Sequence, residues 1–226
     1  MEIATREPDL VDEAELEELV ALGHRVGYPP KSVLVREGER TDFVLYLLSG
    51  HLKVVTGRPP AIVRLYRPGS VAGERAAVTG HPRSADLVAV NRVEAIMVSG
   101  RDWYEFIQRH PGMLLRLYAD SLNRLESRDP SKSESVPTAE MKVASSLLLL
   151  LKSGLGESGT DGHLICGITQ QDLGYLNGMS RESVSIGLRS LRERGAVTTG
   201  RSRILVHDLD DLERVSQRNY RTAEPL

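Results

Sequence analysis

The chain has 226 residues, enough for two modest domains that each have a hydrophobic core. Its composition is 40% hydrophobic and 27% charged, which is ordinary for a globular protein and excludes a disordered or fibrous chain. No apolar run approaches the roughly 20 residues of a membrane span, and the acidic N-terminus is unlike a secretory signal. We therefore expect a cytoplasmic protein that does not associate with a membrane.

The net charge of −2 conceals a difference between the two ends of the chain. Residues 1–20 carry eight carboxylates and one arginine, whereas residues 168–207 carry six arginines and three carboxylates. A basic C-terminal third indicates that this part approaches a polyanion. A solvated surface of mixed charge is the commoner reason for such a count, so charge alone does not decide between the two.

The N-terminal half has the pattern of a β-rich domain. A short helix is predicted over residues 12–22, and short apolar runs broken by Gly and Pro follow it. The predicted strands are Val33–Arg36, Val44–Leu48, Leu52–Thr56, Ile62–Tyr66, Asp86–Val90 and Val93–Val98. Ser49-Gly50-His51 is predicted to form a tight hairpin between two of them. Regular short strands separated by glycine turns predict a β-sandwich or barrel for this part of the chain.

Helical spacing begins after Gly100, and residues 101–130 are predicted to form a long dimerisation helix. Its apolar residues recur at spacings of 3, 4 and 3, namely Leu115, Tyr118, Leu122 and Leu125. This is the a/d pattern of two helices that pack side by side, although the same stripe can pack on the chain's own β domain. Pro130 ends the helix, and residues 131–137 are predicted to be a hinge.

Residues 138–226 are predicted to form a winged helix-turn-helix domain. Its first helix is expected to begin after Thr138 and to bury Met141, Ala144, Ser145, Leu148 and Leu149. A short helix over 170–177, a turn at Gly178 and a second helix over 181–194 capped by Ser180 have helix-turn-helix spacing. Residues 197–207 are predicted to be a β-hairpin wing with a basic tip that contacts phosphate.

The outer face of the second helix carries side chains that can read base edges. Val184, Leu188 and Leu191 form its buried face, so the opposite face holds Glu182, Ser185, Ile186, Arg189 and Glu193, with Arg181 and Arg192 at its margin. Arginine pairs with guanine, glutamate accepts from the cytosine amino group, and an aliphatic side chain contacts the thymine methyl group. An ordinary surface helix is the alternative, and it accounts least well for an exposed isoleucine.

The two segments Ile168–Gly174 and Gly178–Val184 resemble the helix-turn-helix of the CRP/FNR family of transcription regulators, and the plan of residues 15–207 is similar to that family. The resemblance implies a protein of the α+β class in which residues 1–100 form an antiparallel β-roll or jelly-roll sensor domain. It also implies a homodimeric DNA-binding regulator that recognises a palindromic operator and works with RNA polymerase. It implies base contacts for Arg181 and Glu182, and contacts to the DNA backbone for Thr169, Gln171 and Ser180. Ile186 departs from the family, because the cyclic-AMP-responsive members carry arginine there.

The segments Arg67–Glu74 and Pro82–Ala85 resemble the phosphate-binding cassette of cyclic-nucleotide sensors. The resemblance implies that Gly73 and Glu74 face the ribose and that Arg83 and Ser84 face the phosphate of an effector such as cyclic AMP or cyclic GMP. By ungapped counting, Arg128 stands where cyclic-AMP-responsive members offer a small hydroxyl residue to the base, and an arginine there can stack on a base or donate to guanine.

Other features of the cassette leave its ligand open. Ala72 replaces an aromatic residue of the family, and Arg75 replaces an aliphatic residue beside the carboxylate. The alternatives are a surface loop that binds nothing, which would make an effector-independent regulator, a family member with a different ligand, and a cyclic-nucleotide-binding regulatory subunit without DNA binding. The predicted winged domain argues against the last of these.

Metal, haem and iron–sulfur chemistry is not expected. The single cysteine, Cys166, cannot hold a cluster, and the six histidines lack ligand spacing, with His81 the only one in the cassette loop. The sequence also lacks Gly-x-Ser-x-Gly, His-Glu-x-x-His and Gly-x-x-x-x-Gly-Lys motifs. We therefore expect no catalytic residues and no enzymatic activity.

Overall fold

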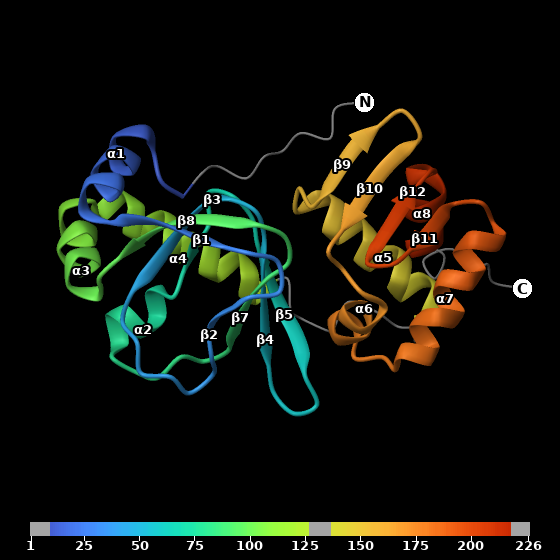
Figure 1. Cartoon of the computed structure of the whole chain (residues 1–226), viewed down its shortest axis with the longest axis horizontal. Helices are drawn as coiled ribbons and strands as arrows, with labels where there is room; N and C mark the ends of the chain where they lie inside the picture. Colours follow the sequence, from blue (N-terminus) through green and yellow to red (C-terminus); the bar gives the residue numbers. More distant parts are fainter. Residues whose placement is uncertain (1–9, 127–136, 218–226) are drawn as a thin grey trace, which may run out of the picture. The chain divides into compact units, whose positions relative to one another are not determined.

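The computed structural model describes residues 10–126 and 137–217. Within these residues the chain forms eight helices and twelve strands, an α+β fold (Figure 1). The strands form three four-stranded sheets, in the orders β1-β8-β3-β6, β2-β7-β4-β5 and β11-β12-β10-β9. Contacts divide the chain into two compact units, residues 1–52 with 66–132 and residues 53–65 with 133–226.

The N-terminal half contains the predicted strands and three elements that the sequence pattern did not reveal. In chain order its elements are α1 (Glu13–Leu22), β1 (His24–Tyr28), β2 (Val33–Val35), β3 (Val44–Ser49), β4 (Leu52–Thr56), β5 (Ala61–Tyr66), β6 (Val71–Ala72), α2 (Glu74–Thr79), β7 (Asp86–Ala89), β8 (Val93–Val98), α3 (Gly100–Arg109) and α4 (Pro111–Glu126). The unpredicted elements are β1, β6 and α2. No residue of β1 is fully buried and the other two are very short, so none has a readable hydrophobic period.

Gly50 makes a corner rather than the predicted hairpin. Its φ of 80° is left-handed, and a Cβ there would lie 2.1 Å from the carbonyl oxygen of Arg92. The strands on either side, β3 and β4, belong to different sheets. The predicted turn is therefore confirmed, but the pairing is wrong, because the turn carries the chain from one sheet to the next.

One buried cluster of the first unit joins the sheet β1-β8-β3-β6 to helices α1, α3 and α4. Trp103 and Phe106 of α3 are buried, with ring centroids 5.7 Å apart, and they share a cluster with Leu19 of α1 and Ile96 of β8. Helices α3 and α4 are separated at His110, where the sequence predicted one continuous helix. Pro111 is the first residue of α4, a position that proline favours because no helical donor is lost there.

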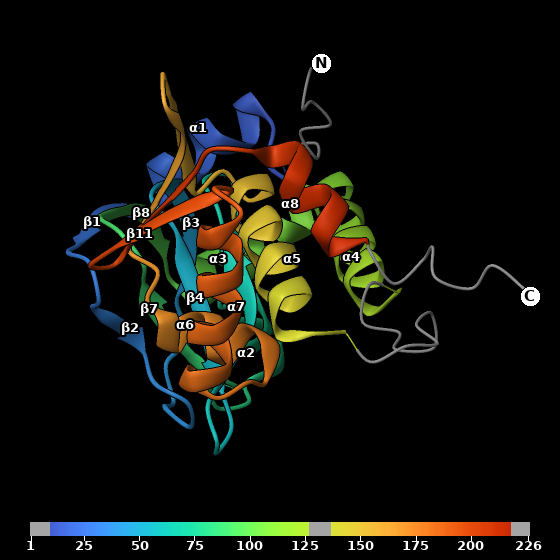
Figure 2. The same cartoon turned by 90° about the vertical axis from the view of Figure 1, so that its right-hand side faces the viewer.

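The second unit is built around α5 (Ala139–Lys152), which packs against both α7 and α8 (Figure 2). Its other elements are β9 (Gly156–Gly159), β10 (Gly162–Cys166), α6 (Gln170–Asn177), α7 (Arg181–Glu193), β11 (Val197–Gly200), β12 (Arg203–Val206) and α8 (Leu209–Ser216). At the contact with α7, a Cβ on Gly187 would lie 2.7 Å from the carbonyl oxygen of Ala139. Glycine at this position thus lets the two helices approach closely.

The buried face of α5 differs from the predicted one. Met141 and Ala144 are buried as expected, but Ser145 and Leu149 are exposed. Val143, Ser146, Leu147 and Leu150 are buried instead. A helix that packs against several neighbours buries more than one stripe, so a prediction based on a single stripe selects some wrong positions.

Candidate functional site

The first helix of the predicted helix-turn-helix, α6, is fixed by its own N-cap. The Thr169 hydroxyl accepts a hydrogen bond from the Asp172 amide at 3.1 Å, and the Asp172 carboxylate accepts from the Thr169 amide at 3.0 Å. This reciprocal pair is a capping box, which sets where the helix begins. The helix spans the same residues as predicted from the sequence, 170–177.

The turn that follows brings α6 and α7 into close contact. Gly178 has a φ of 61°, and a Cβ on Gly174 would lie 2.7 Å from the Met179 carbonyl oxygen. Ser180 caps α7, since its hydroxyl accepts from the Ser183 amide at 3.1 Å. The predicted turn and cap are both confirmed.

Helix α7 presents the predicted two faces. Val184, Leu188 and Leu191 are buried, and Arg181, Glu182, Ile186 and Arg189 are exposed, with Ser185 half-buried between them. Exposure of Ile186 reaches 63% of its surface. The outer face of α7 therefore offers a carboxylate, arginines and one aliphatic side chain to a partner.

The carboxylate of Glu182 is held in its ionised form. Hydrogen bonds from its own backbone amide and from the Ser180 hydroxyl lower the pKa of Glu182, and the charge of Arg181 acts in the same direction. An ionised carboxylate only accepts hydrogen bonds. At this position it matches a donor such as the cytosine amino group.

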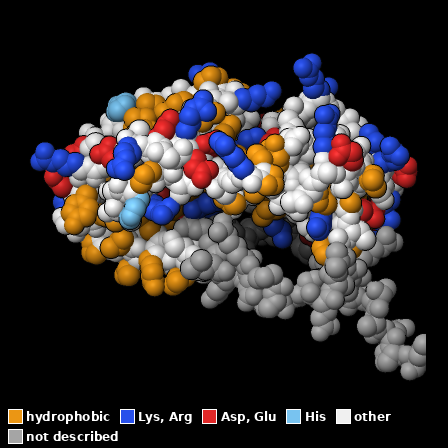
Figure 3. Space-filling model, turned by 90° about the horizontal axis from the view of Figure 1, so that it is seen from below, with side chains coloured by type: hydrophobic (Ala, Val, Ile, Leu, Met, Phe, Trp, Pro, Cys, Tyr) orange, Lys and Arg blue, Asp and Glu red, His pale blue; other side chains and the backbone are white. Residues whose placement is uncertain are grey.

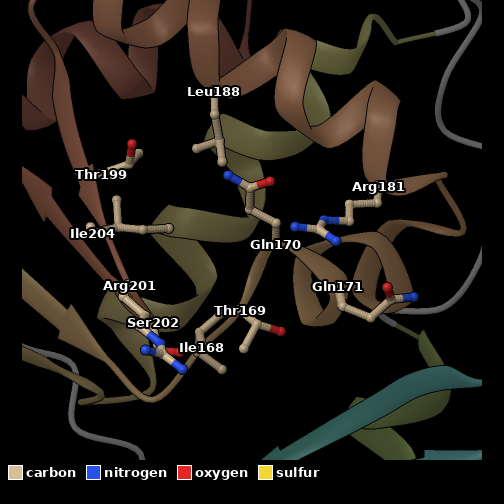
Figure 4. A pocket seen from close by; sticks show the side chains of 11 residues that line it. Ile168, Thr169, Gln170, Gln171, Arg181, Leu188, Thr199, Arg201, Ser202 and Ile204 are labelled. Atoms are coloured by element: carbon tan, nitrogen blue, oxygen red, sulfur yellow. The ribbon is translucent and has the colours of Figure 1, made fainter.

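A cavity of about 400 Å³ lies between the start of α6, α7 and the wing (Figure 4). Three of the predicted residues line it, Thr169, Gln171 and Arg181, whereas the others lie outside its lining on α7. Further lining residues were not singled out as site residues from the sequence, among them Gln170, Arg201 and Ser202. The predicted basic tip of the wing indicated Arg201 and Ser202, whereas no pattern in the sequence indicated Gln170 as a lining residue.

The wing itself is present as the hairpin β11–β12, with Ser202 at a φ of 55° in its turn. Arg192 of α7 donates to the Thr199 hydroxyl of the wing at 3.1 Å, so the helix and the hairpin are joined by a side-chain hydrogen bond. Arg201 and Arg203 are both exposed. Basic side chains thus border the cavity from the wing and from α7, an arrangement suited to a polyanion backbone.

The predicted effector site begins at the start of α2. Gly73 is the N-cap of this helix with a φ of 92°, and Glu74, half-buried, is its first residue. A Cβ on Gly73 would lie 2.5 Å from Nη1 of Arg83 and 3.0 Å from the Phe43 carbonyl oxygen. Only glycine fits there. The structure therefore brings Gly73, Glu74 and Arg83 together as the resemblance implied.

The guanidinium of Arg83 is buried and serves the fold. It donates to the Thr41 hydroxyl at 2.8 Å, to the Gly73 carbonyl at 2.9 Å and to the Phe43 carbonyl at 2.6 Å, and it lies over the Phe43 ring. Each of its three nitrogens is used, so at most two of its five N–H groups remain for a ligand. Burial lowers the pKa of Arg83, while the carboxylates of Asp42, Glu74 and Glu39 oppose that shift.

The remaining cassette residues lie at the surface. Ser84 and Arg75 are exposed, so the substitution at Arg75 does not add a cation to the interior of the site. Arg128, the predicted base contact, and Asp129 lie outside the described residues. The described part of the site thus holds a buried guanidinium at Arg83, a half-buried carboxylate at Glu74 and an exposed hydroxyl at Ser84, groups that can hydrogen-bond to an anion that also carries hydroxyl groups.

An apolar face is exposed along α4. Hydrophobic side chains gather at the lower left of the surface in Figure 3. On α4 the exposed apolar residues are Leu114 at 49%, Leu115 at 68%, Tyr118 at 62% and Leu122 at 42%. The first three residues of the predicted a/d stripe, Leu115, Tyr118 and Leu122, are therefore exposed within this unit, and the side chain of Leu125 lies outside the described part. The alternative, packing on the chain's own β domain, does not hold for Leu115 or Tyr118.

Two features are absent from the residues that the structure describes. Within residues 10–126 and 137–217, no group of three or more His, Cys, Asp or Glu side chains is arranged to hold a metal ion. No helix in the same ranges is both long and apolar enough to cross a membrane.

Two family models match the chain. Residues 25–110 match the cyclic nucleotide-binding domain, and residues 141–215 match the Crp-like helix-turn-helix domain. The chain is 29% identical over 189 residues to the cAMP-activated global transcriptional regulator CRP of Escherichia coli O6:H1, covering 80% of this chain and 88% of the relative. It is 29% identical over 193 residues to the cyclic AMP receptor protein of Thermus thermophilus, covering 84% and 86%.

Solved structures show the same fold. The c-di-GMP responsive global regulator CLP of Xanthomonas campestris aligns with a TM-score of 0.73 at 20% identity, covering 87% of this chain and all of that one. FixK2 of Bradyrhizobium japonicum aligns with a TM-score of 0.69 at 20% identity, covering 85% and 96%. At these identities the likeness concerns the fold alone.

Proposed function

This chain belongs to the CRP/FNR family of transcription regulators, and we propose that it acts as a homodimer that binds a palindromic operator in double-stranded DNA under the control of a small effector. The observation that carries the proposal is the outer face of α7, where Glu182, Ile186 and Arg189 are exposed beside a basic wing. Such a face fits the major groove, and the two recognition helices of a dimer would lie about 34 Å apart, one turn of the duplex.

Operator selection followed by gel shift tests this proposal. We expect the full-length chain to enrich a twofold-symmetric sequence from a randomised duplex library, and Arg181→Ala and Glu182→Ala to change the selected bases. Arg201→Ala is the matched control, because the loss of a wing arginine that contacts phosphate should weaken binding to all sequences alike and lower the salt dependence. Unchanged base selectivity in both α7 variants would contradict the proposal.

The dimer is proposed to form through α4. An exposed stripe of Leu115, Tyr118 and Leu122 at spacings of 3 and 4 fits a second copy of the same helix. Light scattering of the purified chain should give the mass of two chains, and Leu115→Glu with Tyr118→Glu should give the mass of one. Tyr104→Glu on α3, also an exposed aromatic position, is the control and should leave the dimer intact.

The effector is proposed to be a cyclic nucleotide, with Glu74 facing the ribose and Arg83 and Ser84 facing the phosphate. The match of residues 25–110 and the cAMP-activated relatives support this class of ligand. Arg128, outside the described residues, is proposed to contact the base, and no metal, haem or iron–sulfur cluster is proposed. A regulator that needs no effector is the second candidate, because each nitrogen of Arg83 already donates to a protein oxygen.

Isothermal titration with cyclic AMP and then cyclic GMP separates these two candidates. A cyclic-nucleotide sensor should bind about one ligand per chain, and Ser84→Ala, which removes an exposed hydroxyl, should weaken binding about tenfold without affecting the fold. Arg128→Ala should remove any preference between the two nucleotides. No heat with either nucleotide would favour the effector-independent regulator.

We propose a sensor domain at residues 1–100, a dimerisation segment at 101–130, a hinge at 131–137 and a DNA-binding domain at 138–226. The matches to residues 25–110 and 141–215 support this plan. In the proposed mechanism the state of the sensor domain sets the angle between the two recognition helices. We propose that the regulator acts on double-stranded DNA in the cytoplasm, with RNA polymerase as a further partner and without enzymatic activity.

A further inference from the structure

Ile186 is the large apolar side chain on α7 that the second unit leaves most exposed, at 63%. The neighbours on its own face are Glu182, one turn earlier, and Arg189, one turn later, and both are exposed and charged. A surface that docks another protein usually presents several adjacent apolar side chains. A single isoleucine between two charges instead fits a partner that is polar around one small apolar group.

The major groove of DNA has this composition. Its floor offers hydrogen-bonding groups at every base pair, and its one apolar group is the 5-methyl of thymine. Ile186 has neither a donor nor an acceptor, so it cannot read guanine. In a helix a β-branched side chain also holds essentially one χ1 rotamer, which lets isoleucine make an apolar contact with little loss of entropy.

We propose that Ile186 is a specificity-determining residue that selects a T·A base pair in each half-site through the thymine methyl group. This inference rests on the proposed function, because it needs α7 to lie in the major groove. It differs from the base contacts assigned above, since it depends on one methyl group rather than on a hydrogen bond.

Replacing thymine by deoxyuridine tests the inference, because this removes only the methyl group. After an operator has been selected with the full-length chain, each symmetric pair of thymines is replaced in turn and binding is measured by fluorescence anisotropy. At one pair we expect about fourfold weaker binding for each half-site and about fifteenfold for both, the effect of one buried methyl group per half-site. Ile186→Ala should show no response at that pair.

Two further variants make the test specific. Ile186→Arg should select guanine in place of that thymine, because arginine pairs with guanine O6 and N7. Leu149→Ala, which shortens another exposed aliphatic side chain of the same unit, should respond to deoxyuridine as the wild type does. An operator whose response to deoxyuridine is the same in the wild type and in Ile186→Ala overturns this inference alone. A chain that enriches no operator overturns the proposed function and this inference together.

Discussion

Arg83 and Arg181 are both proposed to contact a ligand, yet the structure gives them opposite surroundings. Arg181 is exposed and lines the cavity beside the wing. Arg83 is 5% exposed, and all three of its nitrogens donate to protein oxygens. Arg181 thus has no such structural role among the described residues, whereas Arg83 also holds its loop together. Two arginines that both match a family motif can therefore differ in how much each contributes to the stability of the fold and how much to ligand binding.

The largest expected effect is on stability, in Arg83→Ala. This substitution leaves the carbonyls of Gly73 and Phe43 without their donor, and we expect it to lower the free energy of unfolding by about 3 kcal/mol. Urea unfolding followed by the fluorescence of Trp103 measures this, since Trp103 is the only tryptophan and is buried in the same unit. Arg189→Ala, at an exposed arginine, should change stability by less than about 0.5 kcal/mol. Equal effects of the two variants would remove the contrast between buried and exposed arginines.

Arg181→Ala should show the reverse behaviour. We expect operator binding to weaken by about 2 kcal/mol, roughly thirtyfold, because a bidentate contact to a base is lost. The free energy of unfolding should stay within about 0.5 kcal/mol of the wild type, because this side chain is exposed. Anisotropy titration and urea unfolding on the same preparation give both values. A loss of stability as large as that in Arg83→Ala would show that the exposed arginine also supports the fold.

The helix-turn-helix was predictable because local rules fix it. Thr169, Gly178 and Ser180 each act within a few residues of their own position, as an N-cap, a left-handed turn and a second N-cap. The bounds of α6 and the two faces of α7 follow from these rules and from the helical period. The β9–β10 hairpin escaped prediction, because β9 consists of Gly-Glu-Ser-Gly and has no apolar alternation.

The cassette was predictable in position but not in its contacts. The residues that hold Arg83 are Thr41 and Phe43, about 40 positions earlier in the chain, and Gly73. Two of the three acceptors are backbone carbonyls, which every residue carries and which therefore leave no pattern in a sequence. The cavity beside the wing was missed for a related reason, since it forms only when residues from 168 to 204 come together.

Ser180 allows folding and DNA contact to be separated at one position. Ser180→Ala removes the cap of α7 and should lower the free energy of unfolding by about 1 kcal/mol. Ser180→Asp should keep the cap, because aspartate is an equally good N-cap, yet it should weaken DNA binding by placing a negative charge near phosphate. Thermal unfolding by circular dichroism and anisotropy titration test the two halves. If Ser180→Asp bound DNA as tightly as the wild type, Ser180 would have no role at the DNA backbone.

The smallest expected effect is a pH dependence that extends the comparison to a carboxylate. Burial lowers the pKa of Arg83. The pKa of Glu182 is also lowered, from its ordinary value of 4.5, but by hydrogen bonds from the backbone amide of Glu182 and from the Ser180 hydroxyl. For a carboxylate, a lowered pKa favours the ionised form. Glu182 should therefore become protonated, and lose its role as an acceptor, only as the pH falls below 4.5 and through its pKa in the folded chain.

Operator selectivity at the base pair that Glu182 is proposed to read should accordingly stay constant from about pH 7 to about pH 5. In Ser180→Ala one of the two hydrogen bonds is absent, so selectivity at that base pair should begin to fall at a higher pH than in the wild type. Glu182→Gln is the control, because it carries no titrating group and should give the same selectivity at every pH tested. Loss of wild-type selectivity above pH 4.5 would mean that solvent, rather than the N-terminus of α7, sets the ionisation of this carboxylate.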